Sequence, residues 1–440
     1  MNWLQLLSSQ RLGQKMASPE QSRSAFEQDY DRIIFSHPFR RLQDKTQVHP
    51  LPEHDFVHTR LTHSLEVSTV GRSLGKKAGE IILQRHPELG SKFSLFDFGA
   101  IVAASSLAHD LGNPPFGHAG EDAFSDFFLH HPAGQEFKSK VNEAQWAELV
   151  KFEGNAQGFR ILNKSEYGLK LTYAALGAFT KYPCPAFFPQ RNKTRKSQRK
   201  FGFFESEREI FSEVADQLGL VSTRKNVWCR HPLAFLVEAA DDICYGIIDL
   251  EDGCRLGLVS FEETLDLLAP ILGEKLNRDK LMKNTGLNEK LGVLRAMAIG
   301  ELIDATTAVF LDHEQTMLEG VFDEALTELC EFHEALKKIS EVSVRKIYHA
   351  RHVVEIEAAG HEVLPGLLEE FVQASIHLMK NEKSRKYQNL GLLLPEEIRR
   401  EIQEHPDDPY HLLRNSIDFI SGMTDRHALS LFRKIKGISF

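Results

Sequence analysis

Two histidines and two aspartates stand where they could together hold a divalent metal ion. His63 lies at the start of a helical pattern, and His109 with Asp110 closes an almost wholly apolar segment. Burying a carboxylate costs free energy unless a cation or strong donors compensate, and a bound metal supplies that compensation. An alternative for this segment is a helix that His109 caps while Asp110 faces solvent.

A second acidic segment carries Asp241, Tyr245 and Asp249 at intervals of four residues. At about 100° per residue these side chains form one stripe on a helix, and apolar residues cover its other faces. If this segment supplies a metal ligand, we expect that ligand to be Asp241; a solvated helix face is the alternative. Two imidazoles and two carboxylates suit a transition metal, Mn²⁺ or Mg²⁺, with open positions for water and substrate.

His118 and Glu121 stand three residues apart, just past a Pro-Pro break. If a helix begins there, they share a face, and the carboxylate can hold the imidazole protonated and oriented. Such a pair can deliver a proton to a poor leaving group. A helix-capping pair without a catalytic role is the alternative.

The elements that position these residues are predicted to be helices. After His58, apolar residues recur at intervals of three to five, at Leu61, Leu65, Val70, Leu74, Ala78 and Ile81. The C-terminal third shows similar spacing over residues 321–336 and 353–368. Breaks that contain proline separate the segments, at residues 112–115, 182–185 and 404–406. We expect an all-α fold.

Composition and charge argue against some classes of protein. The 440 residues carry 53 Lys and Arg against 62 Asp and Glu, a net charge of −9, which argues against a generally basic nucleic-acid binder. The longest uncharged apolar run, residues 98–108, is far short of the roughly 20 residues of a membrane span, so no membrane association is expected. Five cysteines without a CxxC pair favour reduced thiols in a cytoplasmic protein.

The order and context of the four candidate ligands resemble the HD-domain metal phosphohydrolases. The surrounding sequence is similar to the deoxynucleoside triphosphate triphosphohydrolases, in particular the bacterial deoxyguanosine triphosphate triphosphohydrolase-like proteins. Five ordered stretches carry the resemblance, at residues 32–48, 59–67, 108–121, 152–157 and 418–426.

The resemblance implies hydrolysis of deoxynucleoside triphosphates, dGTP among them, to a deoxynucleoside and inorganic triphosphate. It implies a divalent metal, Mn²⁺ or Mg²⁺ first and Zn²⁺, Fe²⁺, Ni²⁺ or Co²⁺ as alternatives, on His63, His109, Asp110 and Asp241. His118 and Glu121 would then serve as the catalytic pair, because cleavage next to the sugar 5′ oxygen expels an alkoxide that needs a proton.

Several further residues are expected to bind the substrate. Arg60, one turn before His63, can reach a phosphate, and by resemblance it contacts the α-phosphate; a surface salt bridge is its alternative role. Tyr245 suits stacking on the deoxyribose, and Asp249 suits accepting a hydrogen bond from the 3′ hydroxyl.

By resemblance, Gln47 and Val48 contact the sugar edge, and with Tyr245 and Asp249 they exclude ribose by leaving no space for a 2′ hydroxyl. Many relatives have His where this chain has Asn113 and Gly154. Asn113 can still donate a hydrogen bond to phosphate.

We expect one all-α unit over residues 1–440, with an HD metal-binding catalytic core at 59–252 and an extended C-terminal helical region at 320–440. A basic insertion loop is expected at 186–204, because six of the ten residues at 191–200 are Lys or Arg. A mobile solvated insertion is the favoured interpretation. The alternative is a surface for phosphate or single-stranded DNA, with stacking rings at Phe187, Phe188, Phe201 and Phe203.

Two other functions stay open at this level. One is another HD-type reaction, that of a 5′-nucleotidase or a phosphodiesterase. The other is a module that binds nucleotides or single-stranded DNA around a structural metal. The resemblance also implies a homo-oligomer, a hexamer or tetramer, with a nucleotide or single-stranded DNA as effector.

Overall fold

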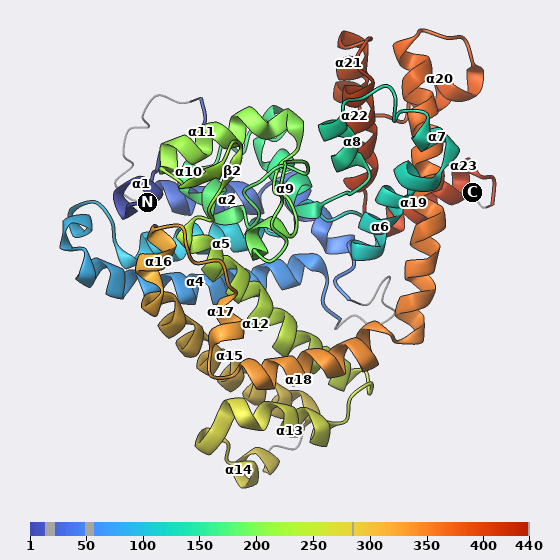
Figure 1. Ribbon diagram of the computed structural model, residues 1–440. Coiled ribbons are helices and arrows are strands. Elements are labelled where there is room, and N and C mark those ends of the chain that lie inside the picture. The colour runs from blue at the N-terminus through green and yellow to red at the C-terminus, as the bar shows by residue number, and fades with distance from the viewer. Residues whose placement is uncertain (14–22, 49–56, 284–285, 439–440) are drawn as a thin grey trace.

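The computed structural model describes residues 1–13, 23–48, 57–283 and 286–438, and its regular structure is almost entirely helical (Figure 1). Strands in these ranges are limited to an antiparallel pair, β1 (Ser222–Arg224) and β2 (Val227–Trp228). The prediction of an all-α fold is confirmed. Across the described ranges, no helix is both long and apolar enough to span a membrane.

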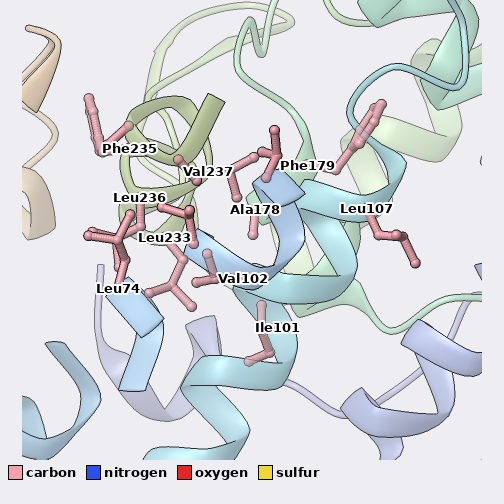
Figure 2. Close-up of a cluster of buried hydrophobic side chains, with 14 of the residues drawn as sticks. Leu74, Ile101, Val102, Leu107, Ala178, Phe179, Leu233, Phe235, Leu236 and Val237 are labelled. Carbon is pink, nitrogen blue, oxygen red and sulfur yellow. The ribbon is translucent and has the colours of Figure 1, made fainter. Parts of the chain in front are cut away.

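Four helices form the centre of the larger hydrophobic core. They are α4 (Arg60–Arg85), α5 (Leu95–Ala108), α10 (Tyr173–Phe179) and α12 (Pro232–Arg255). Figure 2 shows side chains from all four helices gathered in one cluster, among them Leu74, Ile101, Val102, Ala178, Phe179, Leu233 and Leu236. The predicted metal ligands lie on or directly after three of these helices, so this core sets their relative positions.

Helices α4 and α5 pack unusually closely because glycines line the contact. A Cβ atom at Gly75 would lie 2.7 Å from the carbonyl oxygen of Phe98, and one at Gly71 would lie 2.5 Å from the hydroxyl of Ser106. His63 lies about two turns before Gly71, towards the start of α4. The antiparallel pairing therefore carries His63 to the end of α5, where His109 follows.

Local capping fixes where these helices begin. Thr59 and Thr62 form a reciprocal capping box at the start of α4. At the start of α12, the His231 ring accepts a hydrogen bond from the Leu233 amide and Pro232 occupies the first helical position. These caps therefore fix the residue at which α4 and α12 begin.

A second hydrophobic core joins α6 (Gly117–His130) to the C-terminal helices α19 (Arg351–Met379), α21 (Glu396–Glu404), α22 (Pro409–Ser421) and α23 (Asp425–Ile435). In Figure 1, α6 lies beside the long orange helix α19, with α22 close by. The helix that carries His118 and Glu121 is thus packed by residues more than 200 positions later in the chain.

The remaining helices surround these two cores. They are α1 (Trp3–Leu6), α2 (Ala25–Ile34), α3 (His37–Arg41), α7 (Pro132–Gln135), α8 (Glu143–Leu149), α9 (Gly154–Asn163), α11 (Arg208–Leu218), α13 (Phe261–Leu272), α14 (Arg278–Met282), α15 (Leu287–Asp312), α16 (Glu314–Leu318), α17 (Leu326–Leu329), α18 (His333–Ser343) and α20 (Arg385–Gly391).

The helical spacing at residues 321–336 does not correspond to one helix. Only α17 and the start of α18 are helical there. The Asp323 carboxylate instead pairs with Arg195 and accepts hydrogen bonds from the amide and hydroxyl of Ser197. This contact holds residues 321–325 against a loop that is distant in sequence. The tertiary contact therefore prevents the continuous helix that the spacing of apolar residues predicts.

That distant loop is the basic segment 191–200, which is exposed at residues 192–194 and 199 but buried at residues 196–198. The Arg191 guanidinium donates to the carbonyls of Pro185 and Ala186 at 2.6 and 2.7 Å. Residues 196–198 form a buried 3₁₀ turn, and Lys196 pairs with Glu328.

Most of the aromatic rings suggested as a stacking surface in the same region are buried. Phe201 and Phe203 are fully buried and Phe188 is nearly so, whereas Phe187 is exposed. Most of the aromatic side chains near the basic segment therefore belong to the core.

Candidate metal centre and active site

The structure brings the four predicted metal ligands together. Donor atoms of His63, His109 and Asp110 all lie within 4.8 Å of one another. Oδ1 of Asp241 lies 3.2 Å from Nε2 of His63 and 3.4 Å from Nε2 of His109. Three separate segments thus converge on one point, as the sequence pattern predicts.

The orientation of these groups fits a divalent metal ion. Nδ1 of His109 lies 2.7 Å from the carbonyl oxygen of Ser106, so this nitrogen carries the proton and Nε2 is free to ligate. Nδ1 of His63 is buried without a hydrogen-bond partner among the described residues. Two imidazole nitrogens and two carboxylate oxygens form a donor set typical of transition metals and Mn²⁺.

Two cations hold the outer oxygens of the ligating carboxylates. Nη1 of Arg60 donates to Oδ2 of Asp110 at 2.5 Å, and Nζ of Lys181 donates to Oδ2 of Asp241 at 3.0 Å. Burial raises the pKa of Asp110, but the charges of Arg60, His109 and His63 together outweigh it and the pKa is lowered overall. Because Arg60 is buried, its ion pair is part of the site and not the surface salt bridge considered above.

His118 and Glu121 form the predicted pair on the first turn of α6. Nδ1 of His118 lies 2.9 Å from Oε2 of Glu121, and Oε1 of Glu121 accepts a hydrogen bond from the Gly154 amide at 2.7 Å. The bond to Glu121 raises the pKa of His118. The pair does not cap α6, because Phe116 occupies the N-cap position and no side chain makes a capping bond there.

A cavity of about 440 Å³ connects the metal ligands with this pair. Of the predicted substrate-binding residues, those that line it are Gln47, Val48, Arg60, Asn113 and Tyr245. The structure therefore brings almost the whole predicted set around a single cavity.

Asp249 is placed differently from Tyr245, although both lie on α12. Asp249 is buried outside the cavity lining, and its Oδ2 accepts a hydrogen bond from the Tyr348 hydroxyl at 2.8 Å. Burial raises the pKa of Asp249 to about 8. Tyr348, at the end of a π-helical turn (Val344–Tyr348), lines the cavity beside Tyr245, with ring centroids 5.4 Å apart.

Sequence reasoning missed several residues that line the cavity: Asn155, Lys181, Tyr182, Lys200, Asp242, Tyr348, Val353 and Glu357. Two signals could have found some of them. Lys181 and Tyr182 border the predicted break at 182–185, and Lys200 ends the basic segment. For Tyr348 and the residues of α19, we find no local signal.

Asn113 and Gly154, the two positions singled out in the sequence, lie in contact with each other. A Cβ atom at Gly154 would lie 2.3 Å from Oδ1 of Asn113 and 2.9 Å from Oε1 of Glu121. The Asn113 amide also donates to Oδ1 of Asp110 at 2.5 Å. Asn113 therefore links a predicted metal ligand to the space beside the His118–Glu121 pair, and a side chain at position 154 would displace the side-chain ends of Asn113 and Glu121.

His58 ties the start of α4 to α12 and supplies a test of this framework. Its Nδ1 lies 2.6 Å from Asp252 and its Nε2 lies 3.2 Å from Glu66. Burial lowers the pKa of His58, but the hydrogen bonds to Asp252 and Glu66 outweigh it and raise the pKa to about 10.

We expect His58→Gln to lower the free energy of unfolding by about 1–2 kcal/mol near neutral pH, because it removes hydrogen bonds to charged groups. A raised histidine pKa stabilises fully below the unfolded pKa of about 6.5, and this contribution is lost as pH rises through about 10. Urea denaturation of both proteins at pH 6, 8 and 10 should show the difference shrinking. A difference that grows with pH would contradict the charged His58.

The comparisons with known proteins agree with this geometry. The HD domain model, which describes metal-dependent hydrolases, matches residues 60–158, and the model of a phosphohydrolase-associated domain matches residues 329–434. Three relatives named deoxyguanosinetriphosphate triphosphohydrolase-like proteins align with the whole chain. They are 44% identical in Synechocystis sp., 39% in Pseudomonas aeruginosa and 33% in Listeria monocytogenes, over 100%, 99% and 100% of their own lengths. The chain belongs to the deoxyguanosinetriphosphate triphosphohydrolase-like family of HD-domain hydrolases.

Proposed function

We propose that this protein hydrolyses deoxynucleoside triphosphates, dGTP among them, to a deoxynucleoside and inorganic triphosphate. The observation that carries the proposal is the placement of the oriented His118–Glu121 pair in the same cavity as the four predicted metal ligands. A reaction that expels a sugar alkoxide needs both charge stabilisation at phosphorus and a proton donor.

His63, His109, Asp110 and Asp241 would hold the metal, with Mn²⁺ or Mg²⁺ as our first choice. A divalent ion bound there supplies Lewis-acid stabilisation of a phosphoryl oxygen and lowers the pKa of a bound water. Arg60 and Lys181 keep the outer carboxylate oxygens paired, which orients the inner oxygens towards the ion.

His118 is the proposed general acid. As the bond between the α-phosphorus and the 5′ oxygen breaks, His118 gives its proton to that oxygen, and the sugar leaves with a 5′ hydroxyl. Glu121 holds the imidazole through Nδ1, so the other ring nitrogen is the one that delivers the proton. The water oxygen ends on the α-phosphorus, and triphosphate is released intact.

The cavity also has groups for the rest of the substrate. Arg60, Lys181 and Lys200 lie along a lining that also carries the carboxyl groups of Asp110, Glu121, Asp241, Asp242 and Glu357. These three cations and a bound divalent ion together would supply the positive charge for a triphosphate of about four negative charges in a protein of net charge −9. Local potential, and not net charge, decides whether this substrate binds.

We place the deoxyribose between Gln47 and Val48 on one side and Tyr245 on the other. The Tyr348 hydroxyl, held by Asp249, is a polar group for the 3′ hydroxyl. On this proposal Asp249 acts through Tyr348. The same arrangement would disfavour a 2′ hydroxyl at the Val48 edge.

A substrate panel tests the proposal. We expect purified protein to release triphosphate from one or more of the four deoxynucleoside triphosphates in the presence of Mn²⁺, Mg²⁺, Co²⁺ or Zn²⁺, and to do so far more slowly from GTP than from dGTP. Faster turnover of GTP would contradict the sugar contacts. Release of orthophosphate alone would favour a different HD-type reaction.

The pH dependence of kcat should report the His118–Glu121 pair. A general acid must be protonated, so kcat should fall as pH rises through the pKa of His118, which Glu121 raises above its ordinary value of about 6.5. Glu121→Gln removes the charge that raises it, so the alkaline fall should move to lower pH. An unmoved alkaline limb in this variant would show that another group titrates there.

A further inference from the structure

The turn that joins α22 to α23 makes contacts that the proposed catalytic cycle does not use. Together with the helix ends that flank it, from Asp418 in the last turn of α22 to Asp425 at the first position of α23, it lies within the last of the five stretches singled out in the sequence. We propose that Asp425 is a positioning residue. It holds residues 46–48, the sugar-edge loop, and residues 116–118, the His118 turn, in the positions that the reaction requires. This inference rests on the proposed function.

Asp425 is almost fully buried, and both of its carboxylate oxygens are occupied. Oδ2 accepts hydrogen bonds from the Thr46 amide at 2.9 Å and from the Thr46 hydroxyl. Oδ1 accepts a hydrogen bond from the Phe116 amide at 3.1 Å. One side chain from the C-terminal region thus joins two segments that are 70 residues apart.

Each of these two segments leads directly into the cavity. Gln47 and Val48 follow Thr46, and His118 comes two residues after Phe116. Phe116 has a φ of 64°, a left-handed conformation that bulky side chains rarely adopt and that the surroundings must hold in place. The hydrogen bond to Asp425 is part of that restraint.

A second contact from the same turn reinforces the first. The buried ammonium of Lys45 donates to the carbonyl oxygen of Ser421 at 2.8 Å and to that of Asn113 at 2.5 Å. Lys45 thereby ties the turn to the chain just before Phe116. The sugar-edge loop, the His118 turn and the C-terminal turn form one hydrogen-bonded unit.

The other end of the turn reaches the partner of His118. Asp418 accepts hydrogen bonds from Arg160 and Gln157 on α9. The first amide of α9, that of Gly154, donates to Glu121. Asp418, in the last turn of α22, therefore supports Glu121, and Asp425, at the start of α23, supports His118.

The chemistry of Asp425 calls for a carboxylate in particular. It accepts three hydrogen bonds, two of them from backbone amides, and donates none. An asparagine at this position would present its NH₂ group to an amide or hydroxyl donor and lose at least one of these bonds. The change is close to isosteric, so the loss of positioning can be separated from loss of packing.

The test compares Asp425→Asn with the matched control Glu370→Gln. Glu370 is also a buried carboxylate in the C-terminal region, but its partners are Lys386 and Lys436, away from the cavity. We expect Asp425→Asn to lower kcat for dGTP about 10- to 100-fold, as misplaced reacting groups do, and to speed amide hydrogen exchange at Thr46 and Phe116. Glu370→Gln should change neither.

A double variant separates positioning from a merely structural role. In a His118→Ala background, Asp425→Asn should lower kcat only a few-fold, because the imidazole that the Phe116 contact positions is already gone and only the Thr46 contact at the sugar edge is left to lose. The full loss in that background would overturn the proposal, and so would unchanged exchange at Thr46 and Phe116. If Asp425→Asn does not fold, Thr46→Val removes a single bond of the same contact, and an unchanged kcat in that variant would likewise overturn it. Hydrogen exchange tests the positioning contacts even if wild-type protein releases no triphosphate, an outcome that would refute only the proposed function.

Discussion

Asp241→Ala is expected to abolish hydrolysis, with a loss in kcat of about 10³-fold or more. A metal-stabilised transition state is lower by several kcal/mol, and each 1.4 kcal/mol is a factor of ten in rate. The variant also leaves Lys181 without the carboxylate that it pairs with. The kcat from steady-state kinetics and the metal content per chain should both fall.

The adjacent carboxylate supplies the control for this variant. Asp242 lines the cavity, but its Oδ2 accepts a hydrogen bond from the Thr327 hydroxyl at 2.7 Å. Asp242→Asn should therefore retain bound metal. If Asp241→Ala kept both metal and turnover, the assignment of the four ligands would be wrong.

His118→Ala should lower kcat by about 10²- to 10⁴-fold, the usual contribution of a general acid. Metal content and folding should not change, because the imidazole is largely exposed to the cavity and contacts none of the metal ligands. His130→Ala is the matched control, since His130 lies at the other end of the same helix and faces solvent. Near-normal turnover in His118→Ala would instead favour a reaction with a better leaving group, such as that of a phosphodiesterase.

The positions of the ligands could be predicted because each depends on local sequence. The caps at Thr59 and His231 and the glycine stripe on α4 fix where helices begin and how closely they pack. The residue types at His63, His109 and Asp241 then indicate metal ligation. The His118–Glu121 pair was predictable for the same reason, since a three-residue interval on a helix determines its geometry.

The rest of the cavity lining could not be predicted, because it depends on contacts between segments that are far apart in the sequence. Tyr348 reaches the site only because the chain turns at the end of α18, nearly 100 residues after Asp249. The basic segment is partly buried through its contacts with Asp323 and Glu328, and this pairing has no local signature in the sequence. Asp425 is a similar case, because its partners are more than 300 residues away.

The most direct test of the account is the fate of the water oxygen. Hydrolysis of dGTP in H₂¹⁸O, followed by ³¹P NMR and mass spectrometry, should place one ¹⁸O on a terminal phosphorus of intact triphosphate and none in the deoxyguanosine. Label in the deoxyguanosine would mean attack at the sugar carbon. Labelled pyrophosphate or orthophosphate would mean cleavage within the triphosphate chain, and either result would contradict the proposed reaction.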